Sequence, residues 1–232
     1  MISTMPTDGA PRVLATVPRI SHSSASASAW SVASAPTSSK SVYMSVSKMI
    51  FSGAPDANVA CVGGLDWDGD MTPWECPPLT PRDTPCAGRA DAYLDLVMSR
   101  ILPAARDAVS GVPVFVALAG YSLAGLFALY AAHRCDAFDR VASMSGSLWF
   151  PGFADWVRAH DFVKAPERIY LSLGDVEERS RHPLLKTVRK NTEAVVEHWR
   201  SRGLDVRWEL NPGNHFKDVV TRTARGIAAV LR

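Results

Sequence analysis

The sequence has no excess of charge of one sign. Its 232 residues include 25 Lys and Arg against 23 Asp and Glu, which gives a formal charge of +2 at pH 7. We therefore expect neither a nucleic-acid-binding arm nor a polybasic membrane anchor. No run of about 18 apolar residues occurs, because Gly120, Tyr121, Ser122 and Gly125 interrupt the longest apolar stretch. We expect no membrane span, and we expect a cytoplasmic location because the first residues lack the basic start and apolar run of a signal peptide.

Cysteine is scarce as well, with four residues and no C-x-x-C pair. None has a histidine at metal-ligand spacing, and the aspartates of 66–70 lack the later glutamate of an EF-hand loop. The sequence therefore predicts no metal and no cofactor. Cys76 and Cys86 could meet across a loop, but free thiols in a reducing compartment are expected for all four, namely Cys61, Cys76, Cys86 and Cys135.

Hydrophobic residues make up 47% of the chain and charged residues 21%, the balance of a globular protein with one substantial core. Residues 21–40 contain nine Ser and five Ala, a composition that predicts a poorly ordered connection. Arg12 to Val17 and Ser41 to Phe51 are expected to be outer strands on either side of it. We therefore divide the chain into an N-terminal segment, 1–57, which is partly of low complexity, and an organised domain, 58–232.

From residue 58 onward, short apolar runs that end in glycine alternate with helical periodicity. This alternation is typical of an α/β fold with a mostly parallel central sheet flanked by helices. The run 114–119 is apolar throughout, as expected for a central parallel strand covered on both faces. The long loop 65–88 is rich in Pro, Asp and Trp, and such loops are usually functional. Strands are expected at 58–62, 114–119, 140–144, 168–173 and 206–210, and helices at 88–109, 123–134, 183–202 and 218–231.

The strongest local motif is GYSLAG at 120–125, where an apolar strand runs directly into a helix. It fits the G-x-S-x-G nucleophile elbow, except that Ala124 stands at the second glycine. The sharp turn would present the Ser122 hydroxyl above the sheet. Free amides at the helix N-terminus, that of Leu123 among them, would favour an oxyanion. Because a serine that merely caps a helix gives a similar match, the partner residues decide.

Two later strands end in residues that could activate this serine. Strand 168–173 runs into the acidic loop 174–178, and strand 206–210 runs into a turn that carries His215. The chain order serine, acid, histidine is that of α/β-hydrolases, and the carboxyl ends of parallel strands share one edge of a sheet. His215 is preferred because it directly follows a strand, unlike His22, His133, His160, His182 and His198. Spacing alone leaves the acid open among Asp175, Glu177 and Glu178.

Four segments together, GYSLAGLFALYAA, VASMSGSLWFPGF, IYLSLGDVEERSR and ELNPGNHFKD, resemble the esterase branch of the α/β-hydrolases. This group contains esterase D and the enterochelin-type trilactone siderophore esterases. The resemblance implies that 58–232 is an α/β-hydrolase catalytic domain that hydrolyses carboxylic esters without a metal. It also implies that the acid lies three residues after the glycine that ends its strand, which points to Glu177. The family's upstream strand with a second oxyanion amide has no clear equivalent here.

The resulting hypothesis is a serine esterase that acts on a small-molecule ester. Ser122 attacks the carbonyl, His215 carries the proton, Glu177 orients the imidazole and the Leu123 amide stabilises the oxyanion. Acyl transfer by the same triad and a catalytically silent binding protein of this fold are the alternatives. The oligomeric state is left open, and the aspartates of 66–70 disfavour a strongly anionic catecholate. The residues expected to line the substrate pocket are Trp67, Trp74, Tyr121 and Trp149, although the three tryptophans fit core positions equally well.

Overall fold

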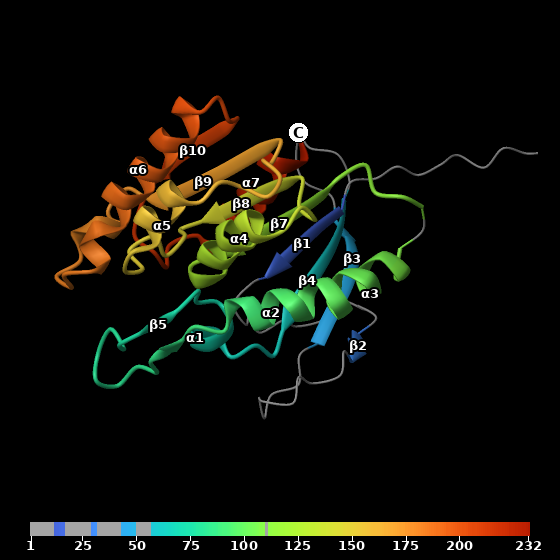
Figure 1. The fold of residues 1–232 in the computed structure, drawn as a ribbon, viewed down its shortest axis with the longest axis horizontal. Helices are drawn as coiled ribbons and strands as arrows, with labels where there is room; N and C mark the ends of the chain where they lie inside the picture. Colours follow the sequence, from blue (N-terminus) through green and yellow to red (C-terminus); the bar gives the residue numbers. More distant parts are fainter. Residues whose placement is uncertain (1–11, 17–28, 32–42, 50–56, 110) are drawn as a thin grey trace, which may run out of the picture.

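An eight-stranded sheet forms the centre of the computed structural model, which describes residues 12–16, 29–31, 43–49, 57–109 and 111–232 (Figure 1). The strand order is β10-β9-β8-β7-β1-β4-β3-β2. The six strands from β10 to β4 run parallel, and β3 and β2 continue the sheet in antiparallel fashion. The strands are β1 (Arg12–Thr16), β2 (Ala29–Ser31), β3 (Tyr43–Met49), β4 (Ala57–Gly63), β7 (Val116–Tyr121), β8 (Arg140–Met144), β9 (Arg168–Gly174) and β10 (Val206–Asn211).

Helices cover both faces of this sheet and divide the core in two. One face packs against α2 (Ala90–Leu96), α4 (Leu123–Arg134), α5 (Phe153–Ala159) and α6 (Val188–Ser201), and Figure 1 shows α2 and α4 in front of the sheet. The other face packs against α7 (Val219–Leu231). Strand β7 serves both cores because its side chains alternate. Leu118 belongs to the first cluster and Ala117, Ala119 and Tyr121 to the second.

Shorter elements complete the chain between β4 and β7. The helix α1 (Trp67–Asp70) and a two-stranded ribbon, β5 (Glu75–Cys76) and β6 (Cys86–Ala87), lie within the long loop. Cys76 stands opposite Cys86 in this ribbon, and both are thiols. The expected helix 88–109 is α2, a π-helical turn at Val97–Ile101 and α3 (Leu102–Asp107) in succession. Pro103, which has no N–H to donate, lies in the first turn of α3.

The predicted α/β architecture is confirmed, and several predicted elements need correction. The run Arg12 to Val17 was expected at the edge of the sheet, but β1 lies centrally, paired with β4 and β7. The stretch 21–40 was expected to be irregular. It contains the short strand β2, and the rest of it lies outside the described residues. Helix α5 was not predicted, and helix α6 begins five residues later than expected, after a 3₁₀ turn.

None of the helices in the described part of the chain has the length and apolar character needed to cross a membrane.

Candidate active site

Ser122 lies at the junction of β7 and α4 in a strained backbone conformation. Its φ and ψ angles are 60° and −126°, a region that non-glycine residues rarely adopt. Neighbouring backbone fixes the turn, since the Ser122 amide donates to the Met144 carbonyl at 3.1 Å and the Ser122 carbonyl accepts from the Ser147 amide at 3.1 Å. Gly120 is required here, because a Cβ atom at this position would lie 2.1 Å from the Ala124 carbonyl oxygen. The methyl group of Ala124 is accommodated in the core, where this residue is 1% exposed.

The side chains of Ser122, His215 and Glu177 form a continuous hydrogen-bonded chain. His215 Nε2 lies 3.0 Å from Ser122 Oγ, and His215 Nδ1 lies 2.9 Å from Glu177 Oε2. The three residues follow the carboxyl ends of β7, β10 and β9, strands that share one edge of the sheet. The Glu177 side chain is 4% exposed and that of His215 is 28% exposed. The acid is thus enclosed, while the imidazole reaches solvent.

The Glu177 carboxylate receives further hydrogen bonds on its second oxygen. Oε1 accepts from Ser145 Oγ at 2.7 Å, from the Gly174 amide at 2.5 Å and from Arg222 Nη1 at 3.2 Å. Burial raises the pKa of this carboxyl group, but hydrogen bonds from His215, Gly174 and Ser145 outweigh burial, so the pKa is lowered. Glu177 is therefore an ionised acceptor facing the imidazole at neutral pH.

The two neighbouring acids have other partners. Asp175 Oδ1 accepts a hydrogen bond from the Gly213 amide at 2.8 Å, and Glu178 forms an ion pair with Arg189 at 3.1 Å. Of the three acids that the sequence left open, Glu177 is the one that contacts His215.

Leu123 is the first residue of α4, and the first amides of a helix have no intrahelical acceptor. This amide belongs to the residue directly after Ser122, the position from which an α/β-hydrolase elbow stabilises an oxyanion. The helix dipole adds partial positive charge at the same end. The loop after β1, which neighbours β7 in the sheet, lies outside the described residues.

A cavity of about 720 Å³ opens above Ser122 and His215. Its aromatic surface comes from Trp67, Trp149 and Phe216. Phe216 is 83% exposed, and its ring lies edge-on to that of His215 with the ring centroids 5.1 Å apart. Charged residues of both signs also line the cavity, so its walls suit a ligand with apolar and polar parts. These charged residues are Asp68, Arg82, Asp83, Glu177 and Arg179.

Two residues expected in the pocket, Trp74 and Tyr121, do not line this cavity. Tyr121 is 2% exposed and faces the α7 side of the sheet, since it shares the parity of Ala117 and Ala119 in β7. Its hydroxyl donates to the His215 carbonyl oxygen at 2.6 Å. Trp74 packs against three aromatic rings, and its indole N–H donates to the Pro151 carbonyl at 3.0 Å. Trp74 therefore anchors the long loop to the start of α5.

Sequence reasoning did not single out Ser145 or Arg222, which both contact Glu177. Ser145 follows β8 with a positive φ of 46°, and Arg222 is 2% exposed within α7. The one available signal was the position of Arg222 on the otherwise apolar face of the predicted helix 218–231. Among the residues that the structure describes, no cluster of His, Cys, Asp and Glu is arranged to bind a metal ion.

Comparison with known proteins shows the family of this chain. The model of the family described as "Putative esterase" matches residues 58–217, more than half of the chain. The chain belongs to this esterase family. An uncharacterized protein of Bacillus subtilis, YbbA, is 25% identical over 137 residues, which are 58% of this chain and 55% of that protein. The chain thus matches little more than half the length of this curated relative.

Solved structures similar to this chain confirm the α/β-hydrolase fold. The siderophore hydrolase EstB of Aspergillus nidulans superposes with a TM-score of 0.68 at 18% identity, covering 92% of this chain and 98% of its own. An IroE-like serine hydrolase of Shewanella oneidensis gives a TM-score of 0.71 at 14% identity, covering 89% and 80%. The predicted fold class and family are therefore both confirmed.

Proposed function

We propose that this member of the esterase family is a serine carboxylic-ester hydrolase that acts through an acyl-enzyme. The observation that carries the proposal is the chain of contacts from Ser122 Oγ to His215 Nε2 at 3.0 Å and from His215 Nδ1 to Glu177 Oε2 at 2.9 Å. The nucleophile and the orienting acid are thus each within hydrogen-bond reach of the base, beneath a cavity large enough for a small ester.

The proposed reaction forms an acyl-enzyme and then hydrolyses it, with two proton transfers in each of these stages. As Ser122 Oγ attacks the ester carbonyl carbon, His215 Nε2 takes the hydroxyl proton, and the negative carbonyl oxygen faces the Leu123 amide. His215 then gives the proton to the leaving alcohol as the ester bond breaks. Water attacks the acyl-enzyme with His215 again as the base, and the proton returns to Ser122 when the acid leaves. Glu177 stabilises the imidazolium that exists between these transfers.

The substrate class follows from the cavity and from the similar structures. Aromatic walls at Trp67, Trp149 and Phe216 suit an ester with an aromatic or other bulky apolar part. Because acids and arginines line the same cavity, its charge does not select a strongly anionic ligand. EstB is described as a siderophore hydrolase, so uncharged siderophore-type esters are the first compounds to test on this chain.

Replacing Ser122 tests the mechanism. We expect Ser122→Ala to abolish both the hydrolysis of a short p-nitrophenyl ester and labelling by a fluorophosphonate probe, with an unchanged circular dichroism spectrum. Ser143→Ala is the matched control, because Ser143 is a buried serine of the adjacent strand β8 that does not line the cavity. Turnover that survives in Ser122→Ala would exclude the mechanism. A folded wild-type protein that neither turns over nor becomes labelled would instead indicate a silent binding protein.

Acyl transfer uses the same three side chains and differs only in the acceptor. Product analysis in the presence of a competing alcohol separates the two reactions. Free acid as the main product supports hydrolysis, whereas a new ester as the main product supports transfer.

A further inference from the structure

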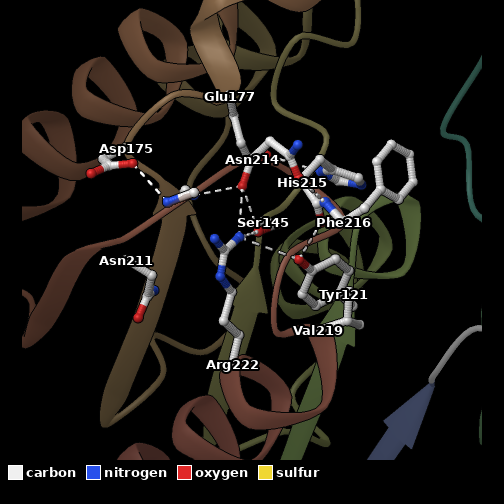
Figure 2. Close-up of polar contacts among 12 residues, drawn as sticks. Tyr121, Ser145, Asp175, Glu177, Asn211, Asn214, His215, Phe216, Val219 and Arg222 are labelled. Carbon is white, nitrogen blue, oxygen red and sulfur yellow. Dashed lines mark hydrogen bonds and ion pairs between the residues drawn. The ribbon is translucent and has the colours of Figure 1, made fainter.

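Arg222 contacts residues at the ends of four strands beneath the candidate active site. Its Nη1 atom lies 3.1 Å from Ser145 Oγ, 3.2 Å from Glu177 Oε1 and 3.5 Å from the Tyr121 hydroxyl (Figure 2). Its Nη2 atom donates to the Pro212 carbonyl at 3.0 Å. These partners follow or end the strands β8, β9, β7 and β10. One guanidinium group of α7 thus joins the carboxyl ends of four adjacent strands.

The surroundings of Arg222 are built for a buried cation. The residue is 2% exposed, so its charge needs an anionic partner in place of water, and the Glu177 carboxylate provides it. The end of β9 leaves room for the side chain, because Gly174 has no Cβ atom. A Cβ atom there would lie 2.9 Å from Arg222 Nη2 and 2.1 Å from the Gly213 carbonyl oxygen.

These contacts restrict both partners of the acid–base pair. Arg222 binds Oε1 of Glu177, which leaves Oε2 to face His215 Nδ1. On the other side, its bond to the Pro212 carbonyl ties down the turn that carries His215. The Tyr121 hydroxyl, next to the guanidinium, donates to the His215 carbonyl at 2.6 Å. The planar fork of an arginine suits this simultaneous binding, whereas a lysine ammonium provides a single point of attachment.

We propose that Arg222 is a positioning residue for the ester hydrolysis proposed above: it orients the Glu177 carboxylate toward His215 and fixes the turn that presents the imidazole to Ser122. The inference depends on that proposed function. Arg222 does not line the cavity and contacts neither Ser122 nor the side chain of His215, so it acts through Glu177, Tyr121 and the backbone.

A positioning role makes a prediction about pH that a purely structural role does not. The titratable and charged groups facing Glu177 are His215 from the turn after β10, Arg222 from α7 and Tyr121 from β7. Arg222 is the permanent cation among them. Without it, the Glu177 carboxylate is protonated more readily, because a positive charge no longer opposes protonation. The lower limb of the pH–activity profile should then move upward, by about one pH unit.

The experiment compares Arg222→Met and Arg222→Lys with Arg225→Met, a variant of an exposed arginine on the same helix that does not contact Glu177. The rate of fluorophosphonate labelling and kcat and KM for a p-nitrophenyl ester are measured between pH 5 and 9. We expect Arg222→Met to lower the labelling rate and kcat at least about 100-fold, to move the lower limb upward and to leave KM within about threefold. Arg222→Lys, which keeps the charge but loses the fork, should lose about tenfold and keep the wild-type limb.

Arg222→Met with a wild-type limb and a labelling rate within twofold of Arg225→Met would overturn the inference. If Arg222→Met does not fold, Arg222→Lys is compared with Arg225→Lys instead. Equal labelling rates in these two variants would overturn the inference. A failure of the proposed function is distinguishable from either result, because the wild-type protein itself would then not be labelled at Ser122.

Discussion

Replacing Glu177 with glutamine tests the role of the acid, whose side chain is 4% exposed. The change keeps the shape of the side chain and exchanges one oxygen for an NH₂ group. Oε2 faces His215 Nδ1, and Oε1 accepts three hydrogen bonds. If the NH₂ group takes the position of Oε2, His215 must carry its proton on Nε2 and cannot accept one from Ser122. If the NH₂ group takes the position of Oε1, it faces three hydrogen-bond donors and no acceptor.

The structure therefore leaves glutamine no satisfactory orientation. The loss in kcat should be close to the loss caused by removing the carboxylate altogether. Removing the charge of the triad acid in serine hydrolases costs roughly 10³–10⁴ in kcat, or about 4–5.5 kcal/mol of transition-state stabilisation. Asp175→Asn and Glu178→Gln are matched controls in the same loop. Each removes one carboxylate charge that contacts Gly213 or Arg189 rather than His215, so we expect activity within about threefold of wild type.

The assay is kcat for a p-nitrophenyl ester at pH 8, with an unfolding curve for each variant. Glu177→Gln also leaves the buried Arg222 without its anion, a change that typically costs roughly 3–5 kcal/mol of stability. Activity is therefore measured at a temperature at which the variant is folded. A folded Glu177→Gln protein that retains more than a tenth of wild-type kcat would refute the assignment, as would an equal loss in either control.

Two further predictions test other parts of the structure. His133 is 4% exposed and stacks on Phe162 with ring centroids 3.8 Å apart, and burial lowers its pKa from 6.5 to about 4. As the pH falls, His133 is protonated in the unfolded chain near pH 6.5 but in the folded protein only near pH 4. The folded state therefore loses stability below pH 6.5, by about 2 kcal/mol at pH 5. His133→Phe should remove that share of the pH dependence in urea unfolding at pH 7 and 5, and identical pH dependence in both proteins would contradict this. Gly120→Ala would bring a Cβ atom to 2.1 Å from the Ala124 carbonyl and should lower fluorophosphonate labelling at least about 100-fold, while Ala124→Gly labels within about threefold of wild type. Full labelling of Gly120→Ala would show that the elbow tolerates a side chain.

The sequence predicted what depends on local pattern. The predicted strands 140–144 and 168–173 match β8 and β9 to within one residue, and the helix 123–134 matches α4 at both ends. The location of β1 could not be read in this way, because the choice of β4 and β7 as its neighbours is made by long-range pairing. Five residues carry too little pattern to distinguish an edge from a central position.

Side-chain direction was the other limit. Strand parity groups Tyr121 with Ala117 and Ala119, but only the packing of α7 shows that this face is the one away from the cavity. Spacing likewise could not choose among three acids in one loop. That choice depends on the 3₁₀ turn at Glu177–Arg179 and on the amide of Gly174, which orient one carboxylate toward His215.

The residues of the candidate site come from one half of the sheet. Ser122, Ser145, Glu177 and His215 follow four adjacent strands, β7 to β10, and Arg222 joins the ends of these strands from α7. All of these elements come from residues 116–231. The hydrogen bonds described among Ser122, His215 and Glu177 therefore involve no side chain of the segment 1–57, although β1 of that segment pairs with β7 just before the serine. That segment contributes β1, β2 and β3 to the sheet, so substitutions in these strands should alter stability before they alter the hydrogen bonds among Ser122, His215 and Glu177.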